Sequence, residues 1–156
     1  MMEQRMKTMD TALLLESYRD LLQTVEMLPL VVTGNSMLPF LVHKRDSVYL
    51  TKIKKPLKVG DMVLYQRLNG EYILHRICRI TDKAYCMVGD AQTVIEPDIT
   101  EEQLIAVVCK AQRKGKVQKP GCFWWFFFEN IWIRMIPCRP VLQRLYGVFH
   151  QCFRRK

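Results

Sequence analysis

A chain of 156 residues that is 49% hydrophobic and 25% charged has the composition of one globular domain with attached helices. Its six cysteines show neither a Cys-x-x-Cys pair nor metal-ligand spacing, which argues against a zinc module or a disulfide framework and for reduced thiols in a cytosol-facing protein. The formal net charge of +9 resides in the C-terminal part, where eleven Lys or Arg and one acid follow residue 109. We therefore expect no metal and no cofactor, and a basic C-terminal segment.

Residues 1–28 are predicted to form an amphipathic helix. Tyr18, Leu22 and Val25 recur at helical spacing along this segment. The apolar run at residues 11–15 is too short for the core of a signal peptide, and charged residues follow it at once. We therefore expect no signal peptide here.

Residues 29–114 are predicted to form a mainly β domain. Six runs rich in Val, Ile, Leu and Tyr are separated by turn residues: LPLVVT, SVYLTKI, DMVLYQR, EYILHRICRI, AYCMV and QLIAVVCKAQ. The dipeptide Asn69-Gly70 lies between the third and fourth runs, and both of its residues tolerate positive φ. These two runs should therefore form an antiparallel hairpin, with His75 in the middle of its second strand.

Residues 115–156 form a basic tail in which apolar residues are interleaved with the charges. Six consecutive aromatic residues, Phe123 to Phe128, are followed after Pro140 by an apolar helical face with polar and basic residues opposite. This pattern is typical of a helix that lies in a lipid interface, so it predicts peripheral membrane contact through residues 122–156 rather than binding to nucleic acid. The alternative is that the apolar face packs on the β domain or on a partner chain.

No segment predicts a transmembrane helix, which needs about 20 predominantly apolar residues. The most apolar stretch, residues 122–136, contains Glu129 and Arg134 and lies between Pro120 and Pro137. We therefore expect the protein in the cytoplasm or peripherally on the cell membrane.

The first motif whose residues could take part in a reaction is GNSMLP. It begins at Gly34, contains Asn35 and Ser36, and directly follows a predicted strand. A serine on an exposed bend can place its hydroxyl beside free backbone N–H groups that hold an oxyanion. Taken alone, a Gly-x-Ser sequence is more often an ordinary turn.

Two further motifs carry titratable side chains. In Leu74-His75-Arg76 the histidine shares a strand face with apolar neighbours, where a lone histidine is more often a core residue than a base. Gly89-Asp90 follows another predicted strand, and Glu96 and Asp98 come shortly after it. An acid after glycine at a strand end is also commonly a turn or a cap.

Together, the order GNSMLPFL, RDSVYL, KVGDMVLY, YILHRI, VGDAQ and IAVV resembles the signal peptidase I and LexA-like serine peptidase superfamily, over residues 29–109. In that family the base is lysine in most bacterial signal peptidases and self-cleaving repressors. In the endoplasmic-reticulum and sporulation-type branch it is a histidine in a His-Arg-Val or His-Arg-Ile strand. The sequence His75-Arg76-Ile77 is similar to this histidine branch.

The resemblance implies a signal-peptidase/LexA-like β fold and a set of roles. Ser36 would be the nucleophile, His75 the general base, and Asp90 the acid that orients the imidazole. Glu96 or Asp98 are the alternatives for this third member. The Ser36 backbone N–H would bind the oxyanion, with Asn35 or Thr33 as helpers.

The sequence thus predicts a serine endopeptidase that cleaves leader or signal-like peptides through an acyl-enzyme. One alternative is a regulator of the LexA-like class that cleaves itself or a partner, although no helix-turn-helix precedes the β domain. Another is a non-catalytic relative that binds peptides. The presence of both Ser36 and His75 argues for the enzyme.

Overall fold

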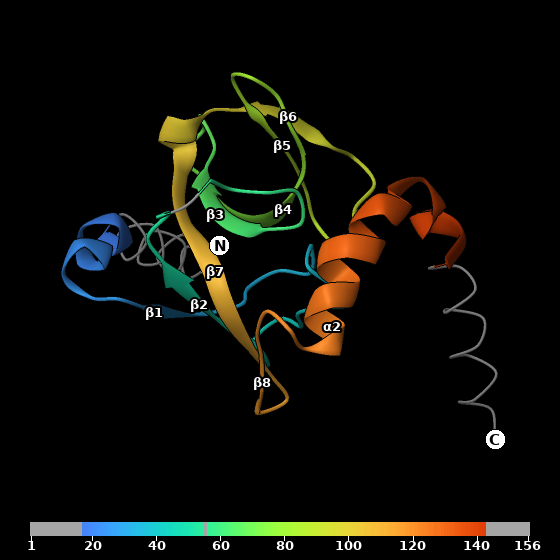
Figure 1. Ribbon diagram of the computed structural model, residues 1–156, viewed down its shortest axis with the longest axis horizontal. Coiled ribbons are helices and arrows are strands. Elements are labelled where there is room, and N and C mark those ends of the chain that lie inside the picture. Colours follow the sequence, from blue (N-terminus) through green and yellow to red (C-terminus); the bar gives the residue numbers. More distant parts are fainter. Residues whose placement is uncertain (1–16, 55, 143–156) are drawn as a thin grey trace, which may run out of the picture.

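The computed structural model describes residues 17–54 and 56–142 and shows a mainly β protein (Figure 1). A helix at residues 17–24 precedes the sheet, and a short turn, η1 (Glu101–Gln103), precedes its longest strand. The eight strands are β1 (Leu28–Val31), β2 (Ser47–Thr51), β3 (Met62–Gln66), β4 (Tyr72–Ile80), β5 (Tyr85–Val88), β6 (Glu96–Ile99), β7 (Leu104–Arg113) and β8 (Lys116–Gln118). The mainly β fold class, with helices at both ends of the chain, is confirmed.

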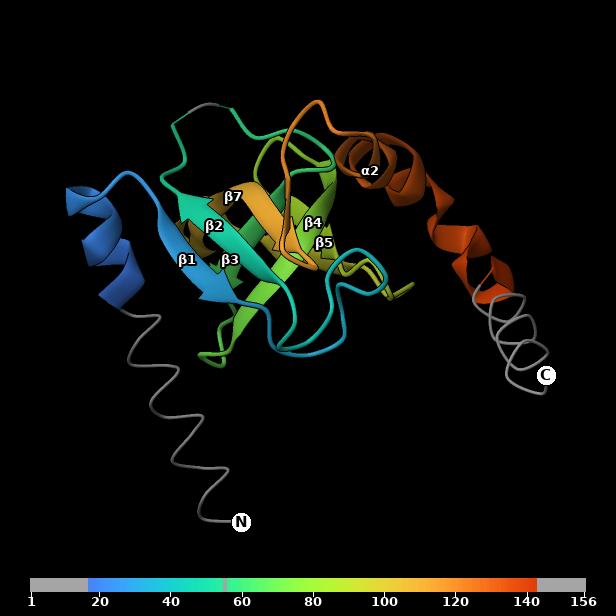
Figure 2. The same ribbon diagram turned by 90° about the horizontal axis from the view of Figure 1, so that it is seen from below.

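All strand pairs are antiparallel, in the order β1-β2-β7-β3-β4-β5-β6, and β8 pairs with β7. The predicted hairpin is confirmed, because β3 and β4 pair with Val63 opposite His75 and with Gly70 at φ +87 in the turn. Figures 1 and 2 show the N-terminal helix beside β1 and β2, and the C-terminal helices on the other side of the sheet.

Two strands were not predicted. β6 contains Pro97 and Asp98, whose φ of +61 is unusual for a strand, so its sequence reads as a turn. β8 follows a tight turn and pairs with the end of β7, which extends the β domain beyond the predicted boundary at residue 114. The remaining predicted parts of the N-terminal helix and of the amphipathic tail, residues 1–16 and 143–156, lie outside the described residues.

The central strands are buried on both faces. Met62 and Leu64 of β3 belong to one apolar cluster, with Leu50, Phe40 and the helix residue Leu22. Their strand neighbours Val63 and Tyr65 belong to a second cluster, whose other buried members are Ile77, Met87, Ile99, Leu104 and Val107. Because successive side chains of a strand point to opposite faces, one strand supplies both cores.

The C-terminal helical segment consists of α2 (Phe123–Phe126), η2 (Phe127–Ile131) and η3 (Trp132–Cys138). It divides the aromatic run between core and solvent. Trp125 and Phe128 are 4% and 3% exposed and pack on Phe40, at ring-centroid distances of 6.2 and 4.9 Å. Phe123 and Phe126, in contrast, are 69% and 54% exposed. No helix within the described ranges is long and apolar enough to cross a membrane.

This division predicts that alanine substitutions of two nearby phenylalanines change the free energy of unfolding by different amounts. We expect Phe128→Ala to lower the free energy of unfolding by about 3–5 kcal/mol, because it removes a buried ring and leaves a cavity. Phe126→Ala, the matched control, should change it by less than about 0.5 kcal/mol, because the ring is exposed. Urea denaturation followed by circular dichroism measures both values, and equal effects would contradict the division.

Candidate active site

Ser36 lies in the turn that follows β1. Gly34 starts the turn at φ +83, a conformation that favours glycine, and its N–H donates a hydrogen bond to Nδ1 of His43 (2.8 Å). The carbonyl oxygen of Ser36 accepts a hydrogen bond from the N–H of Ala91 (2.8 Å). Within the described part of the chain no acceptor takes the N–H of Ser36, so this donor is available to a ligand.

Gly89 is the point at which Ser36 and His75 come together. A Cβ atom at Gly89 would lie 2.5 Å from the Ser36 carbonyl oxygen and 3.1 Å from Nε2 of His75, so only glycine fits there. The Ser36 carbonyl group of the β1 turn and Nε2 of His75 in β4 thus both pack beside Gly89.

The two side chains are not joined directly. Among the residues that the structure describes, no hydrogen bond links the Ser36 hydroxyl to His75. Catalytic hydrogen bonds are often long or poorly aligned before substrate binds. The roles of Ser36 as nucleophile and of His75 as base therefore stay predictions, while the meeting of their segments at Gly89 is a finding.

The other ring nitrogen of His75 is held by a hydrogen-bond chain. Nδ1 of His75 lies 3.2 Å from the Tyr65 hydroxyl, and this hydroxyl donates a hydrogen bond to Oε2 of Glu96 (2.7 Å). His75 and Tyr65 are almost completely buried, and Glu96 is half-buried at the start of β6. The chain therefore runs from the surface carboxylate to the buried imidazole.

This chain assigns the histidine tautomer. A tyrosine hydroxyl has one proton, and here that proton is donated to Glu96, so the tyrosine oxygen can only accept from Nδ1. Neutral His75 then carries its proton on Nδ1, and the free lone pair belongs to Nε2, which packs beside Gly89. This is the tautomer that a general base requires.

Arg67 fixes the outer end of the chain. Its Nε and Nη2 donate hydrogen bonds to Oε1 and Oε2 of Glu96 at 2.8 and 2.7 Å. These bonds lower the pKa of Glu96 below its usual range, which keeps the carboxylate ionised at neutral pH. Burial, with the carboxylate of Glu96 in addition, raises the pKa of Tyr65, so the hydroxyl keeps its proton.

Burial also sets the charge of His75. It lowers the pKa of the imidazole to about 4, because the charged form loses its hydration, and the partly opposing field of Glu96 does not restore it. His75 is consequently neutral at pH 7 and can accept a proton.

Asp90 does not contact His75, which corrects its predicted role. Its carboxylate is fully buried and accepts hydrogen bonds from Nε of Arg76 at 3.0 and 3.2 Å. Arg76 follows His75 along β4, so the two side chains point to opposite faces of the sheet. Asp90 therefore belongs to a structural ion pair on the other face.

The loop after β5 is held in place by the C-terminal helical segment. Nη1 of Arg139 donates hydrogen bonds to the carbonyl oxygens of Gly89 (2.8 Å) and Gln92 (2.7 Å). Nε1 of Trp132 donates one to the carbonyl oxygen of Asp90 (2.8 Å). These contacts fix the position of Gly89, on which the approach of Ser36 to His75 depends.

The other predicted acids and helpers differ in position. Glu96, one of the two alternatives for the third member, reaches His75 through Tyr65, whereas Asp98 is exposed at a positive φ. Asn35 is exposed next to Ser36. Tyr65 was not predicted, although its place two residues from the register partner of His75 puts both on one face of the predicted hairpin.

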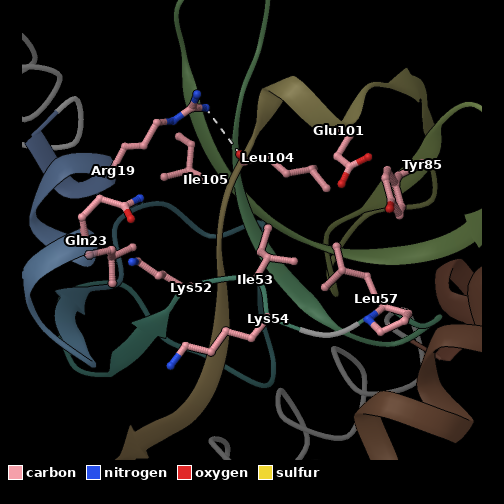
Figure 3. Close-up of a pocket in the computed structure, with 12 residues that line it drawn as sticks. Arg19, Gln23, Lys52, Ile53, Lys54, Leu57, Tyr85, Glu101, Leu104 and Ile105 are labelled. Carbon is pink, nitrogen blue, oxygen red and sulfur yellow. Dashed lines mark hydrogen bonds between the residues drawn. The ribbon is translucent and has the colours of Figure 1, made fainter.

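A cleft of about 580 Å³ lies away from these residues, between the N-terminal helix, residues 52–54 and 56–57 and the start of β7 (Figure 3). Arg19, Lys52 and Lys54 are among the side chains around it, together with Tyr85 and Glu101. Neither Ser36 nor His75 lines it. This cleft is therefore separate from the proposed nucleophile and base.

Comparison of the chain with models of protein families, with curated proteins and with solved structures found no match.

The buried neutral His75 predicts a pH dependence. Its pKa of about 4 in the folded state lies below the value of about 6.5 expected in the unfolded chain, so between these values the unfolded chain binds a proton that the native state does not. The free energy of unfolding should therefore fall as the pH drops through this window, by about 3 kcal/mol. Ring ¹⁵N and ¹H NMR shifts should show an Nδ1–H tautomer at pH 7 and a midpoint near 4, and a midpoint near 6.5 would contradict the burial argument.

Proposed function

We propose that this protein is a serine endopeptidase, with Ser36 as nucleophile and His75 as general base. The observation that carries the proposal is the hydrogen-bond chain from Glu96 through Tyr65 to His75. This chain engages Nδ1 and leaves Nε2, which packs beside Gly89 together with the Ser36 carbonyl group, to act as the base.

The proposed chemistry needs no group beyond these residues and water. The Ser36 hydroxyl oxygen attacks the scissile carbonyl carbon while its proton passes to Nε2 of His75. The C–N bond then breaks, and the leaving amine takes the proton from Nε2. Water attacks the resulting ester through the same base, the ester bond to Ser36 breaks, and the proton returns to the serine.

The oxyanion and the imidazolium that form during these steps each have a group in the site that would stabilise them. The oxyanion of each tetrahedral intermediate would accept a hydrogen bond from the Ser36 N–H, which has no acceptor among the described residues. The imidazolium would be stabilised by the ionised Glu96 through Tyr65. The pair of acid and tyrosine thus takes the part that a single carboxylate has in other serine hydrolases.

The proposed substrates are leader or signal-like peptides bound in extended form. β1 is an edge strand that pairs with β2 on one side, and its chain continues directly into the Ser36 turn. An extended peptide that adds a strand at this edge would lead its backbone toward Ser36. Pro29 removes one donor from β1, and its carbonyl oxygen already accepts a hydrogen bond from the Tyr18 hydroxyl (2.7 Å), so the remaining carbonyl and N–H groups would set the register.

Cleavage of leader peptides, followed by mass spectrometry, tests the enzyme. Ser36→Ala and His75→Ala should each lower kcat/KM by roughly 10⁴-fold or more, because the two groups act as a unit. Because only neutral His75 accepts a proton, activity should rise with pH through a pKa near 4 and be close to its maximum at pH 5.5. Cleavage that survives in Ser36→Ala would sink the proposal, and peptide binding without any cleavage by the wild type would favour a non-catalytic relative.

The identity of the supporting acid is tested by a second set of variants. Tyr65→Phe keeps the ring but removes the acceptor of Nδ1, so kcat should fall about 10²- to 10⁴-fold and the Nδ1–H tautomer should lose its preference in NMR spectra. Glu96→Gln should lower kcat in the same direction. Asp90→Asn should instead lower the free energy of unfolding by about 3 kcal/mol, because it leaves Arg76 without a counter-charge, while the folded fraction keeps its activity. The opposite pattern would restore Asp90 as the third member.

A further inference from the structure

The surface formed by α2 and the β8 hairpin carries exposed aromatic and basic side chains that neither the fold nor the proposed site uses. Phe123, Trp124 and Phe126 are 69%, 49% and 54% exposed. Phe123 and Trp124 contact each other at a ring-centroid distance of 5.2 Å, and Phe126 follows Phe123 by about one turn of the same helix. We call these three residues the aromatic face.

Basic residues surround the aromatic face. Lys116 and Lys119 are exposed on either side of Val117, and Lys116 lies opposite Arg113 in the β7–β8 pair. The guanidinium of Arg113 in turn lies 5.9 Å from the centre of the Trp124 ring, which places the cations of the hairpin next to the aromatic side chains of α2. Figures 1 and 2 both show the β8 hairpin leading directly into α2.

The charge of this region is one-sided. Residues 110–142 contain one acid, Glu129, and seven Lys or Arg, of which Arg139 is buried. That acid is engaged by Lys58, whose Nζ lies 2.8 Å from its carboxylate oxygen. The surface therefore complements a negatively charged partner.

We propose that the aromatic face and its lysines dock the protein on an anionic lipid bilayer. Tryptophan and phenylalanine insert at the boundary between headgroups and acyl chains, and lysines at the edge contact anionic headgroups. An aromatic patch of this kind on a monomer marks an interaction surface. The bilayer is favoured over a protein partner because positive charge surrounds apolar rings without any free acid. The proposal does not depend on the enzymatic activity.

The exposed fraction of each ring shows which aromatic residues can contact the bilayer. Trp125, Phe128 and Trp132 are core residues that pack on the β domain, so they cannot enter a membrane without unfolding the segment. Docking therefore uses one side of α2 and leaves its other side on the domain. The protein would lie on the bilayer with the β8 hairpin against the headgroups.

Vesicle binding by the full chain tests the proposal. Sedimentation with phosphatidylcholine vesicles containing 30 mol% phosphatidylserine should show binding that falls about fivefold for each lysine removed, hence roughly 25-fold for Lys116→Gln with Lys119→Gln. Phe123→Ser with Phe126→Ser should weaken binding about tenfold for each ring. Matched controls are Lys54→Gln with Lys83→Gln, which removes the same charge elsewhere, and Leu68→Ser, which removes a side chain that is 96% exposed on the β3–β4 turn.

Tryptophan fluorescence reports insertion directly. Of the three tryptophans, Trp125 and Trp132 are buried and Trp124 is exposed, so quenching by brominated acyl chains should arise from Trp124. Trp124→Phe should keep the binding and lose most of the quenching. Circular dichroism of each variant establishes that it is folded.

Several outcomes would overturn the proposal. Control variants that weaken binding as much as the surface variants would show general electrostatic attraction instead of docking. Quenching that persists in Trp124→Phe would place another segment in the lipid. Loss of binding to a single-stranded oligonucleotide in the same variants, with vesicle binding unchanged, would identify the surface as a nucleic-acid site.

Discussion

One proton decides the chemistry available to this site, and it is the hydroxyl proton of Tyr65. Because that proton is donated to Glu96, the tyrosine oxygen must accept from Nδ1 of His75, and Nε2 is left free. Arg67 maintains this arrangement by keeping Glu96 ionised. If Glu96 were neutral, the tyrosine could turn its proton to the histidine, and Nε2 would carry a proton and lose its capacity as a base. The tautomer of the buried imidazole is therefore controlled by an ion pair nearer the surface.

The alternation of β4 separates the proposed base from a buried ion pair. His75 and Arg76 are adjacent, yet one joins the Tyr65–Glu96 chain and the other forms the buried ion pair with Asp90. Each network thus has its own acid. The low pKa of His75 shows the cost of this arrangement, since the imidazole is buried without a carboxylate in contact with it. A base of low pKa is a weaker proton acceptor, but it stays neutral in mildly acidic surroundings.

Local patterns in the sequence predicted the elements better than the contacts between them. The β3–β4 hairpin follows from Asn69-Gly70 and period-two alternation, which act over a few residues. The third member of the site could not be assigned in this way, because the distance from Asp90 or Glu96 to His75 depends on how β5, the loop after it and β6 fold back. Gly89 and Asp90 lie in the loop after β5, and the Asp90 carboxylate binds Arg76, whose side chain alternates away from that of His75 along β4. The role of Arg67 depends on its contact with Glu96 in β6, and the proline in this strand makes the sequence of β6 resemble a turn.

The aromatic run shows another limit of sequence patterns. Six consecutive aromatic residues have no apolar period, so the sequence does not indicate which of them face the core. The structure assigns Trp125 and Phe128 to the core and exposes Phe123, Trp124 and Phe126. Removing the whole tail would therefore not isolate its contribution to membrane contact, because the same cut would take core rings from the β domain.

The C-terminal helical segment consequently connects the loop that holds Gly89 with the exposed rings of α2. Its inner side supplies Trp132, and the residue after η3 is Arg139; together they donate three hydrogen bonds to the carbonyl groups of residues 89, 90 and 92. Its outer side carries the exposed rings of α2. A force on α2 at a lipid surface would be transmitted through packed rings to the loop that holds Gly89. Among the described residues, Arg139 is the one buried arginine that binds the carbonyl groups of this loop. Because a shift of Gly89 changes the approach of Ser36 to His75, the geometry of the proposed base is sensitive to the packing of a segment that supplies none of the proposed reacting groups.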